Sequence, residues 1–235
     1  MTSTHVITGA GSGIGRLIAE RLAVRGDRLV LVVRDAERAD DLARAFPGST
    51  PIVADLARPE TLAASLQDAA SPPEAIDSLI HVAGIVDLGR VADLPVAAWT
   101  QQLAVNLVAP AELTRLLLPR LRVARGQVVF VNSGAGLNAH PDWAAYAASK
   151  HGLKALADAL RAEEGAHGVR VTTVYPGRTA TPMQEKVHAQ EGAAYDAARW
   201  IDPASVATAV LTALDLPRDA VISDLTVRPG PRPAP

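Results

Sequence analysis

The sequence has no cysteine, only 3% aromatic residues and almost no net charge. Without cysteine, neither a disulfide framework nor a thiolate metal site can form, which fits a reducing compartment. The 23 basic and 25 acidic residues leave no basic stripe, so nucleic-acid binding is not expected. Because no apolar run approaches ~20 residues, we expect no helix that spans a membrane.

Signals for export and for metal binding are also missing. Residues 1–9 (MTSTHVITG) contain no basic region followed by an apolar one, so we expect no signal peptide and a cytoplasmic location. The histidines show no metal-ligand spacing, so no bound metal is expected. Alanine, by contrast, is abundant, and 235 residues suffice for one sizeable core.

Apolar runs that are typical of buried strands alternate with helical patterns along nearly the whole chain. The runs predict strands at residues 6–8, 28–33, 51–54, 77–82, 128–131, 169–174 and 220–227. Helices are predicted at residues 13–24, 36–45, 59–69 and 203–214, in one or two pieces over 95–121, and through Tyr146 to about residue 164. This alternation predicts an α/β fold: a Rossmann-type, doubly wound parallel sheet with helices on both faces. We expect one domain over residues 1–228 and a flexible, proline-rich tail over 229–235.

The stretch 128–150 (VVFVNSGAGLNAHPDWAAYAASK) carries side chains suited to acid–base chemistry. Tyr146 and Lys150 are four residues apart on a predicted helix, so they share one face. A nearby cation favours the phenolate, so we expect Lys150 to lower the pKa of Tyr146. Ser133, at the end of the preceding strand, could bond the oxygen that gains or loses the proton. The alternative is that Tyr-x-x-x-Lys is an ordinary surface pair on a helix.

A second motif, TGAGSGIG at residues 8–15, lies between the first predicted strand and the first predicted helix. Gly9, Gly13 and Gly15 are spaced as G-x-x-x-G-x-G. In that context, glycines let the backbone approach a pyrophosphate at the positive N-terminus of the helix. The alternative is an ordinary glycine-rich turn.

With Asn106 and the segment YPGRTAT at residues 175–181, these motifs follow the order of one family. The chain resembles a classical short-chain dehydrogenase/reductase over residues 6–225. The resemblance implies that Tyr146 is the general acid/base and that Ser133 orients the substrate oxygen. It also implies that Lys150 lowers the pKa of Tyr146 and holds the nicotinamide ribose. Asn106 would hold a water that relays protons, and local hydrogen bonding is compatible with that role.

The same resemblance implies which residues bind a nicotinamide cofactor. They are Gly9, Ser12, Gly13, Ile14, Gly15, Arg34, Asp55, Leu56, Ala83, Gly84, Tyr146, Lys150, Pro176, Gly177, Thr179 and Thr181. Asp55 matches the residue that contacts the adenine amino group, or it caps the helix predicted at 59–69. Where the family has Asn-Asn-Ala-Gly, this chain has HVAG at residues 81–84. In the family, the Asn at the position of Val82 steadies the central sheet by hydrogen bonding, and Val82 has no side-chain group for that bond.

The end of the second predicted strand indicates which nicotinamide cofactor binds. Val33 occupies the position where the family's NAD enzymes carry Asp, and Arg34 follows where its NADP enzymes place a guanidinium. An arginine can bind a phosphate bidentately, which favours NADP(H), although Asp35 adds a negative charge close by. The alternative is that Arg34 is a solvated loop residue.

We therefore expect an NADP(H)-dependent oxidoreductase that acts on a small carbonyl/alcohol substrate. The resemblance also implies a homodimer or homotetramer, paired through its two long helices. Residues 176–202 are predicted to be irregular, and 181–202 to form a mobile lid. Two alternatives are an NADP(H) sensor without chemistry and an extended-type sugar-nucleotide epimerase or dehydratase, which would need a larger C-terminal part.

No role is assigned to His140, Trp143 and Arg178. His81 is predicted to pack at a strand end. The substrate, its stereochemistry and the reaction direction stay open.

Overall fold

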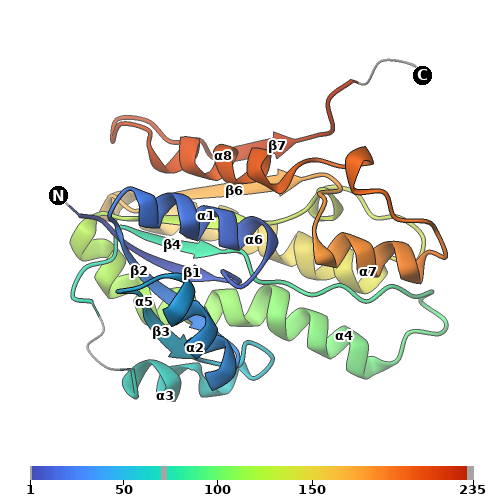
Figure 1. Cartoon of the computed structure of the whole chain (residues 1–235), viewed down its shortest axis with the longest axis horizontal. Helices are drawn as coiled ribbons and strands as arrows, with labels where there is room; N and C mark the ends of the chain where they lie inside the picture. Colours follow the sequence, from blue (N-terminus) through green and yellow to red (C-terminus); the bar gives the residue numbers. More distant parts are fainter. Residues whose placement is uncertain (1, 70–72, 232–235) are drawn as a thin grey trace.

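Seven parallel strands form one sheet with helices on both sides in the computed structural model, which describes residues 2–69 and 73–231 (Figure 1). The strands are β1 (Thr4–Thr8), β2 (Arg28–Val33), β3 (Thr50–Val53), β4 (Ser78–His81), β5 (Gln127–Val131), β6 (Arg170–Pro176) and β7 (Asp224–Val227). Their order across the sheet is β3-β2-β1-β4-β5-β6-β7. The winding reverses between β1 and β4, and sheets of this kind bind ligands there, outside the carboxyl ends of the strands. The predicted Rossmann-type fold is confirmed.

Helices cover both faces of this sheet. They are α1 (Gly13–Val24), α2 (Ala36–Ala45), α3 (Leu62–Gln67), α4 (Val96–Leu103), α5 (Ala109–Ala124), α6 (Ala144–Glu164), α7 (Pro182–Gln190) and α8 (Pro203–Leu214). Leu29 and Leu31 of β2 join a core with α1, α2 and α8. Val30 and Val32, which point the other way, join a core with α3, α5 and α6. Burial on both faces explains why β2 is an unbroken apolar run after Arg28.

Most predicted elements agree closely with the structure. The strand at residues 28–33 and the helices at 13–24, 36–45 and 203–214 are confirmed to the residue. Most other ends differ by one to four residues, and the last strand begins at Asp224 rather than at residue 220. The helix predicted at 59–69 opens with a 3-10 turn, and α3 follows it.

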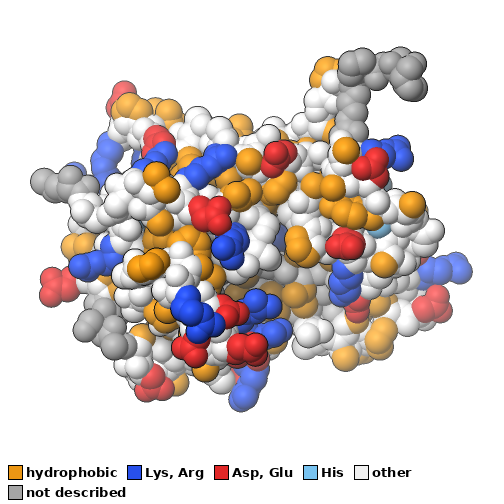
Figure 2. Space-filling model, viewed as in Figure 1, with side chains coloured by type: hydrophobic (Ala, Val, Ile, Leu, Met, Phe, Trp, Pro, Cys, Tyr) orange, Lys and Arg blue, Asp and Glu red, His pale blue; other side chains and the backbone are white. Residues whose placement is uncertain are grey.

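The surface carries basic and acidic side chains side by side, without a broad patch of one sign on the face in Figure 2. No helix within residues 2–69 and 73–231 is long and apolar enough to cross a membrane. In the same ranges, no three His, Asp or Glu side chains gather as a metal site would require.

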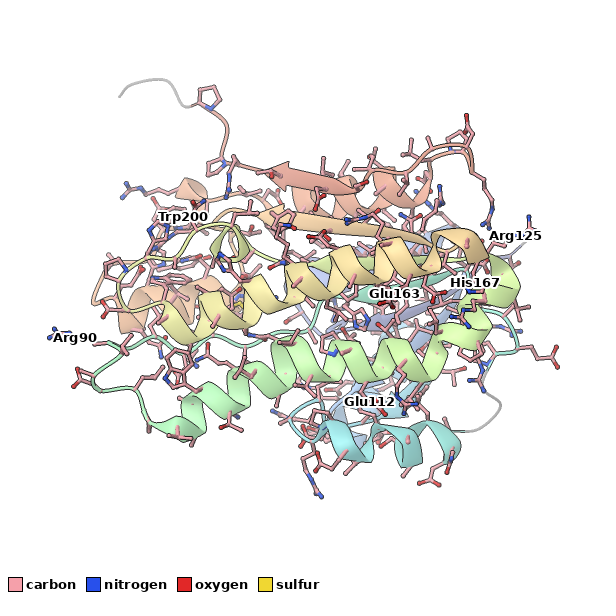
Figure 3. The ribbon with its side chains drawn as sticks, turned by 180° about the vertical axis from the view of Figure 1, so that it is seen from behind. Arg90, Glu112, Arg125, Glu163, His167 and Trp200 are labelled. Atoms are coloured by element: carbon pink, nitrogen blue, oxygen red, sulfur yellow. The ribbon has the colours of Figure 1, made fainter. Side chains whose placement is uncertain are left out.

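The long helical region predicted at 95–121 is two helices joined by a π-helical turn. Ala104–Val108 form this turn between α4 and α5, and Asn106 lies at its centre. In an α-helix the residue at position 110 would donate its N–H to the Asn106 carbonyl, but Pro110 has no N–H. The interruption therefore falls at Asn106, whereas Pro119 is accommodated inside α5. Figure 3 shows α4 and α5 running alongside α6 on this face of the sheet.

The segment predicted to be irregular contains a nine-residue helix, α7, so that part of the prediction is wrong. The Thr181 side chain caps it by accepting a hydrogen bond from the Gln184 N–H, and a proline occupies its first turn. The helix is hard to recognise because its buried face carries Gln184 and His188 beside Val187. Of the tail predicted over 229–235, residues 232–235 lie outside the described ranges.

Candidate active site

A cleft of about 800 Å³ opens beyond the ends of β1, β4, β5 and β6 and brings most of the predicted site residues together. Its lining includes Gly9, Ser12, Gly13, Ile14, Gly15, Ala83, Gly84, Ser133, Tyr146, Lys150, Pro176, Gly177, Thr179 and Thr181. Four predicted site residues lie outside this lining, namely Arg34, Asp55, Leu56 and Asn106. His140, Trp143 and Arg178, which had no predicted role, do line it.

The loop after β1 is shaped by left-handed glycines, Gly9 with a φ of 76° and Gly13 with a φ of 52°. Gly15 packs so closely that a Cβ there would lie 2.3 Å from the carbonyl oxygen of Gly9. Ser12, the N-cap of α1, makes no capping hydrogen bond through its side chain. Because the first N–H groups of a helix also lack intrahelical partners, this loop is a cradle that fits the pyrophosphate of a dinucleotide.

Ser133, Tyr146 and Lys150 meet where β5 ends and α6 begins. Ser133 caps a short turn, and its hydroxyl accepts the backbone N–H two residues on at 3.1 Å. Tyr146 lies buried in the first turn of α6, with its ring edge-on to Trp143 at 5.7 Å. One turn later, the Lys150 ammonium lies 5.8 Å from the centre of the Tyr146 ring and donates to the Val131 carbonyl at 3.3 Å. The structure thus groups the three residues that the sequence singled out.

Burial shifts the protonation of two groups in this set. It raises the pKa of Tyr146 above its ordinary value of 10.0, and a hydrogen bond with Ser133 opposes that shift. Burial also lowers the pKa of Lys150 from 10.5 to about 8. The predicted lowering of the Tyr146 pKa by Lys150 is therefore wrong for this structure, since withdrawal of the phenol from water decides the direction.

Asn106 supports the site from behind Gly84. Its side chain accepts the Ile85 N–H at 2.8 Å and donates to the Ile85 carbonyl at 2.9 Å. It also donates to the Ser149 hydroxyl of α6 at 3.0 Å. A Cβ on Gly84 would lie 3.2 Å from Asn106 Oδ1 and 3.6 Å from Lys150 Nζ. The side chains of Asn106 and Lys150 therefore both approach the backbone of Gly84. Local hydrogen bonding by Asn106 is thus observed, and its proton relay stays a prediction.

Asn132 is a supporting residue that the sequence reasoning missed. It is buried, and its amide donates to the Lys150 carbonyl at 3.0 Å while its oxygen accepts the Ser133 N–H at 2.9 Å. It therefore ties the turn after β5 to α6 and fixes the spacing of Ser133 and Lys150. The available signal in the sequence is an amide side chain directly after the apolar run 128–131.

His81 belongs to the core, as predicted, and not to the cleft. Its ring stacks on Phe130 at 5.0 Å, and its Nε2 lies 2.9 Å from the Thr114 hydroxyl. Burial lowers its pKa from 6.5 to about 3, so the ring is neutral near pH 7. The Thr8 hydroxyl accepts the N–H of Val82 at 3.0 Å and the next N–H at 3.1 Å. That tether joins β1 to the end of β4, where the family's Asn is missing.

Arg178 ties the loop after β6 to α7. Its guanidinium makes two hydrogen bonds with the Glu191 carboxylate, at 2.7 and 2.5 Å. It also lies 5.7 Å from the ring centre of Trp143 and 5.4 Å from that of Trp200. Figure 3 shows Trp200 at the end of the molecule where α6 begins. Because Trp143 packs against Tyr146 as well, this group of side chains links α7 to the candidate acid/base.

A second set of contacts ties α7 to the segment that follows β4. Lys186 donates to the Val86 carbonyl at 2.9 Å. The Asp87 carboxylate accepts hydrogen bonds from Lys186 at 3.3 Å and from Gln190 at 2.6 Å. Helix α7, part of the predicted lid, is therefore anchored to the segments after both β4 and β6.

Three predicted cofactor residues follow β2 and β3, one and two strands from the glycine loop. The Arg34 side chain is 75% exposed and pairs with Asp35 at 3.2 Å, while the Asp35 carboxylate also caps α2. Asp55 accepts the Ala57 N–H at 2.9 Å, so it forms its own turn instead of capping the next helix. Leu56 packs partly against the core.

Comparison with known proteins agrees with this geometry. The chain matches the family described as short chain dehydrogenase over residues 3–192. It is 33% identical over 236 residues to dehydrogenase/reductase SDR family member 7B of Bos taurus, covering 93% of this chain and 73% of that protein.

Solved structures lead to the same family. A short-chain dehydrogenase from Streptomyces avermitilis is 28% identical with a TM-score of 0.83, over 96% of this chain and 88% of that one. A metagenomic short-chain oxidoreductase in complex with NADP is 31% identical with a TM-score of 0.80, over 97% of both chains. The fold and cleft thus define an oxidoreductase of Rossmann type. The chain belongs to the short-chain dehydrogenase/reductase family.

Proposed function

We propose that the protein interconverts a small carbonyl compound and its alcohol with NADP(H). The observation that carries this proposal is the meeting of Ser133, Tyr146 and Lys150 with the glycine loop in one cleft. The left-handed glycines and the free first turn of α1 suit a pyrophosphate. That a relative binds NADP supports the same cofactor class.

Each of the three side chains has a role at a defined atom. Bound NADPH would supply the hydride that reduces the carbonyl carbon. The Tyr146 hydroxyl donates its proton to the carbonyl oxygen, and in the oxidising direction its phenolate takes that proton back. The raised pKa of Tyr146 keeps the phenol protonated near neutrality, which suits the reducing direction. Ser133 hydrogen-bonds the same oxygen, and Lys150 would hold the nicotinamide ribose.

The choice of NADP(H) over NAD(H) rests on the end of β2. Val33 is buried and offers no carboxylate to a ribose 2′-hydroxyl, whereas Arg34 is exposed beside it. The Asp35 carboxylate shares its oxygens between the Arg34 guanidinium and the Arg38 N–H at the start of α2. A 2′-phosphate could replace this weak surface pair at Arg34 with a bidentate contact.

The test is turnover of NADPH with a panel of aldehydes and ketones by wild-type protein and by Tyr146→Phe. The substitution removes only the hydroxyl, so folding and NADPH affinity should persist while the rate falls by ~10²–10⁴-fold. Tyr175→Phe is a matched control, because Tyr175 is buried in β6 and does not line the cleft. Near-wild-type turnover by Tyr146→Phe would remove the acid/base assignment. Tight NADPH binding without turnover of any carbonyl would favour a sensor of the cofactor.

A further inference from the structure

Arg228 lines the cleft, although in the sequence it stands directly before the predicted proline-rich tail. It directly follows β7, the edge strand of the sheet, and lines the same cleft as Tyr146. The Gly177 N–H donates to the Val227 carbonyl at 2.8 Å, which holds the chain beyond β7 against the loop that follows β6. From this position the Arg228 side chain reaches the turn after β5.

A glycine in that turn makes room for the guanidinium. A Cβ on Gly134 would lie 2.5 Å from Arg228 Nη1, 3.4 Å from Cζ and 3.5 Å from Nη2. The guanidinium thus lies against the backbone of the residue that follows Ser133. Any larger residue at position 134 would push Arg228 away from the oxygen-binding end of the cleft.

The charges in the cleft leave Arg228 unbalanced. Glu191 is the one carboxylate in the cleft lining that the described chain provides, and both of its oxygens bond Arg178. Lys150 points to the Val131 carbonyl beside Tyr146. Within residues 2–69 and 73–231, no carboxylate lies within ion-pair distance of Arg228. A ligand at this end of the cleft therefore meets an exposed cation in the same cleft as the proposed proton donor.

The phosphates of a cofactor are poorly placed to balance this charge. The glycine loop follows β1, and the guanidinium lies against the turn after β5, two strands away in the order β1-β4-β5. At about 4.8 Å per strand, the glycine loop and the guanidinium are roughly 10 Å apart. The 2′-phosphate position near Arg34 is one strand farther still. A group carried by the substrate is closer.

We propose that Arg228 selects substrates that carry a carboxylate near the reacting carbonyl, which are oxo acids and the matching hydroxy acids. This inference rests on the proposed oxidoreductase function of the same cleft. The planar guanidinium can bind a carboxylate through two parallel hydrogen bonds. A single guanidinium balances the single negative charge of a carboxylate, whereas a phosphate monoester carries about −1.5 to −2 at pH 7.

The experiment compares acids with their neutral esters: pyruvate with methyl pyruvate, and levulinate with methyl levulinate. Wild-type protein should show a higher kcat/KM for at least one acid than for its ester. Because a charge-assisted contact is lost, Arg228→Gln should lower kcat/KM for that acid by about ten- to a hundredfold and leave the ester unchanged. Arg228→Lys should retain part of the preference, and Gly134→Ala should reduce it by displacing the guanidinium.

The controls separate this inference from the function on which it rests. Arg44→Gln removes an exposed arginine of α2 outside the cleft and should change neither substrate. Equal kcat/KM for acids and esters in the wild type would overturn the role of Arg228, and so would a matching loss of NADPH affinity in Arg228→Gln. If no carbonyl is reduced, the proposed function fails, and calorimetry of the two acids with NADP⁺ present decides the inference. Wild-type protein must then bind an acid more tightly than Arg228→Gln does.

Discussion

Removing the Arg178 guanidinium should loosen α7 without unfolding the rest of the protein. The ion pair with Glu191 is bidentate, and its side chains are 35% and 25% exposed. Such a partly exposed pair contributes about 1 kcal/mol, and each contact with Trp143 and Trp200 about 0.5–1 kcal/mol. Because, in the described part of the chain, only the pair with Glu191 joins Arg178 to the end of α7, local opening of α7 should become roughly fivefold more frequent in Arg178→Gln.

Hydrogen exchange followed by mass spectrometry measures this opening directly. The amides of residues 186–190 should exchange faster in Arg178→Gln, while those of β1, β4 and β5 stay unchanged. Arg178→Lys keeps the charge but loses the bidentate fork, so it should fall between the variant and the wild type. Arg115→Gln is the matched control, because Arg115 makes a bidentate pair with Glu112 on α5.

Two outcomes would refute this reasoning. If α7 exchanges at the wild-type rate in Arg178→Gln, the contacts of Lys186 and Gln190 with the segment after β4 hold the helix alone. If exchange rises equally throughout the sheet, Arg178 stabilises the whole fold rather than α7. The lid hypothesis adds that cofactor and substrate together should slow exchange over residues 181–202.

Three further predictions concern cofactor choice, pH and assembly. Arg34→Ala should weaken NADPH binding by about ten- to a hundredfold and leave NADH binding nearly unchanged, as fluorescence titration would show; a wild-type preference for NADH contradicts this. Because burial lowers the pKa of Lys150 from 10.5 to about 8, the unfolded chain binds more protons between these values. This group should therefore make the free energy of unfolding rise as the pH increases from 8 to 10.5, by roughly 3 kcal/mol, and Lys150→Met should flatten that rise in urea titrations. Finally, α5 and α6 should form a two-fold interface, since Val123 on α5 and Val108 in the turn before it are exposed. Light scattering that finds only the 24.5 kDa chain at micromolar concentration would exclude this interface.

Periodicity was sufficient to predict the sheet and most helices. The strand at 28–33 is apolar on both faces, α1 spans its predicted apolar residues, and α8 begins at Pro203. Helix α7 escaped prediction because its buried face includes Gln184 and His188, which a hydrophobicity pattern counts as exposed. Pro110 marks the interruption at Asn106, but the contacts of the Asn106 side chain with Ile85 and Ser149 are not contained in any local pattern.

The candidate site also contains residues that the sequence predicts and residues that it does not. Ser133, Tyr146 and Lys150 were predictable because two adjacent elements carry them at a characteristic spacing. Arg228 was not, since its place beside Gly134 depends on the pairing of β7 with β6. The direction of the Tyr146 pKa shift was also missed, because sequence spacing reveals a neighbouring charge but not the degree of burial.

The strand order has a consequence for how this cleft is assembled. All neighbouring strands in the described sheet are parallel, so no pair can form as a simple hairpin, and each pair joins residues distant in the chain. Such high contact order slows folding. During synthesis β7 leaves the ribosome after the other six strands of the described sheet, and its neighbour in that sheet is β6. The glycine cradle and Tyr146 can therefore be in place while the Arg228 end of the cleft is still missing. The part of the pocket proposed to choose the substrate is therefore the last part to leave the ribosome.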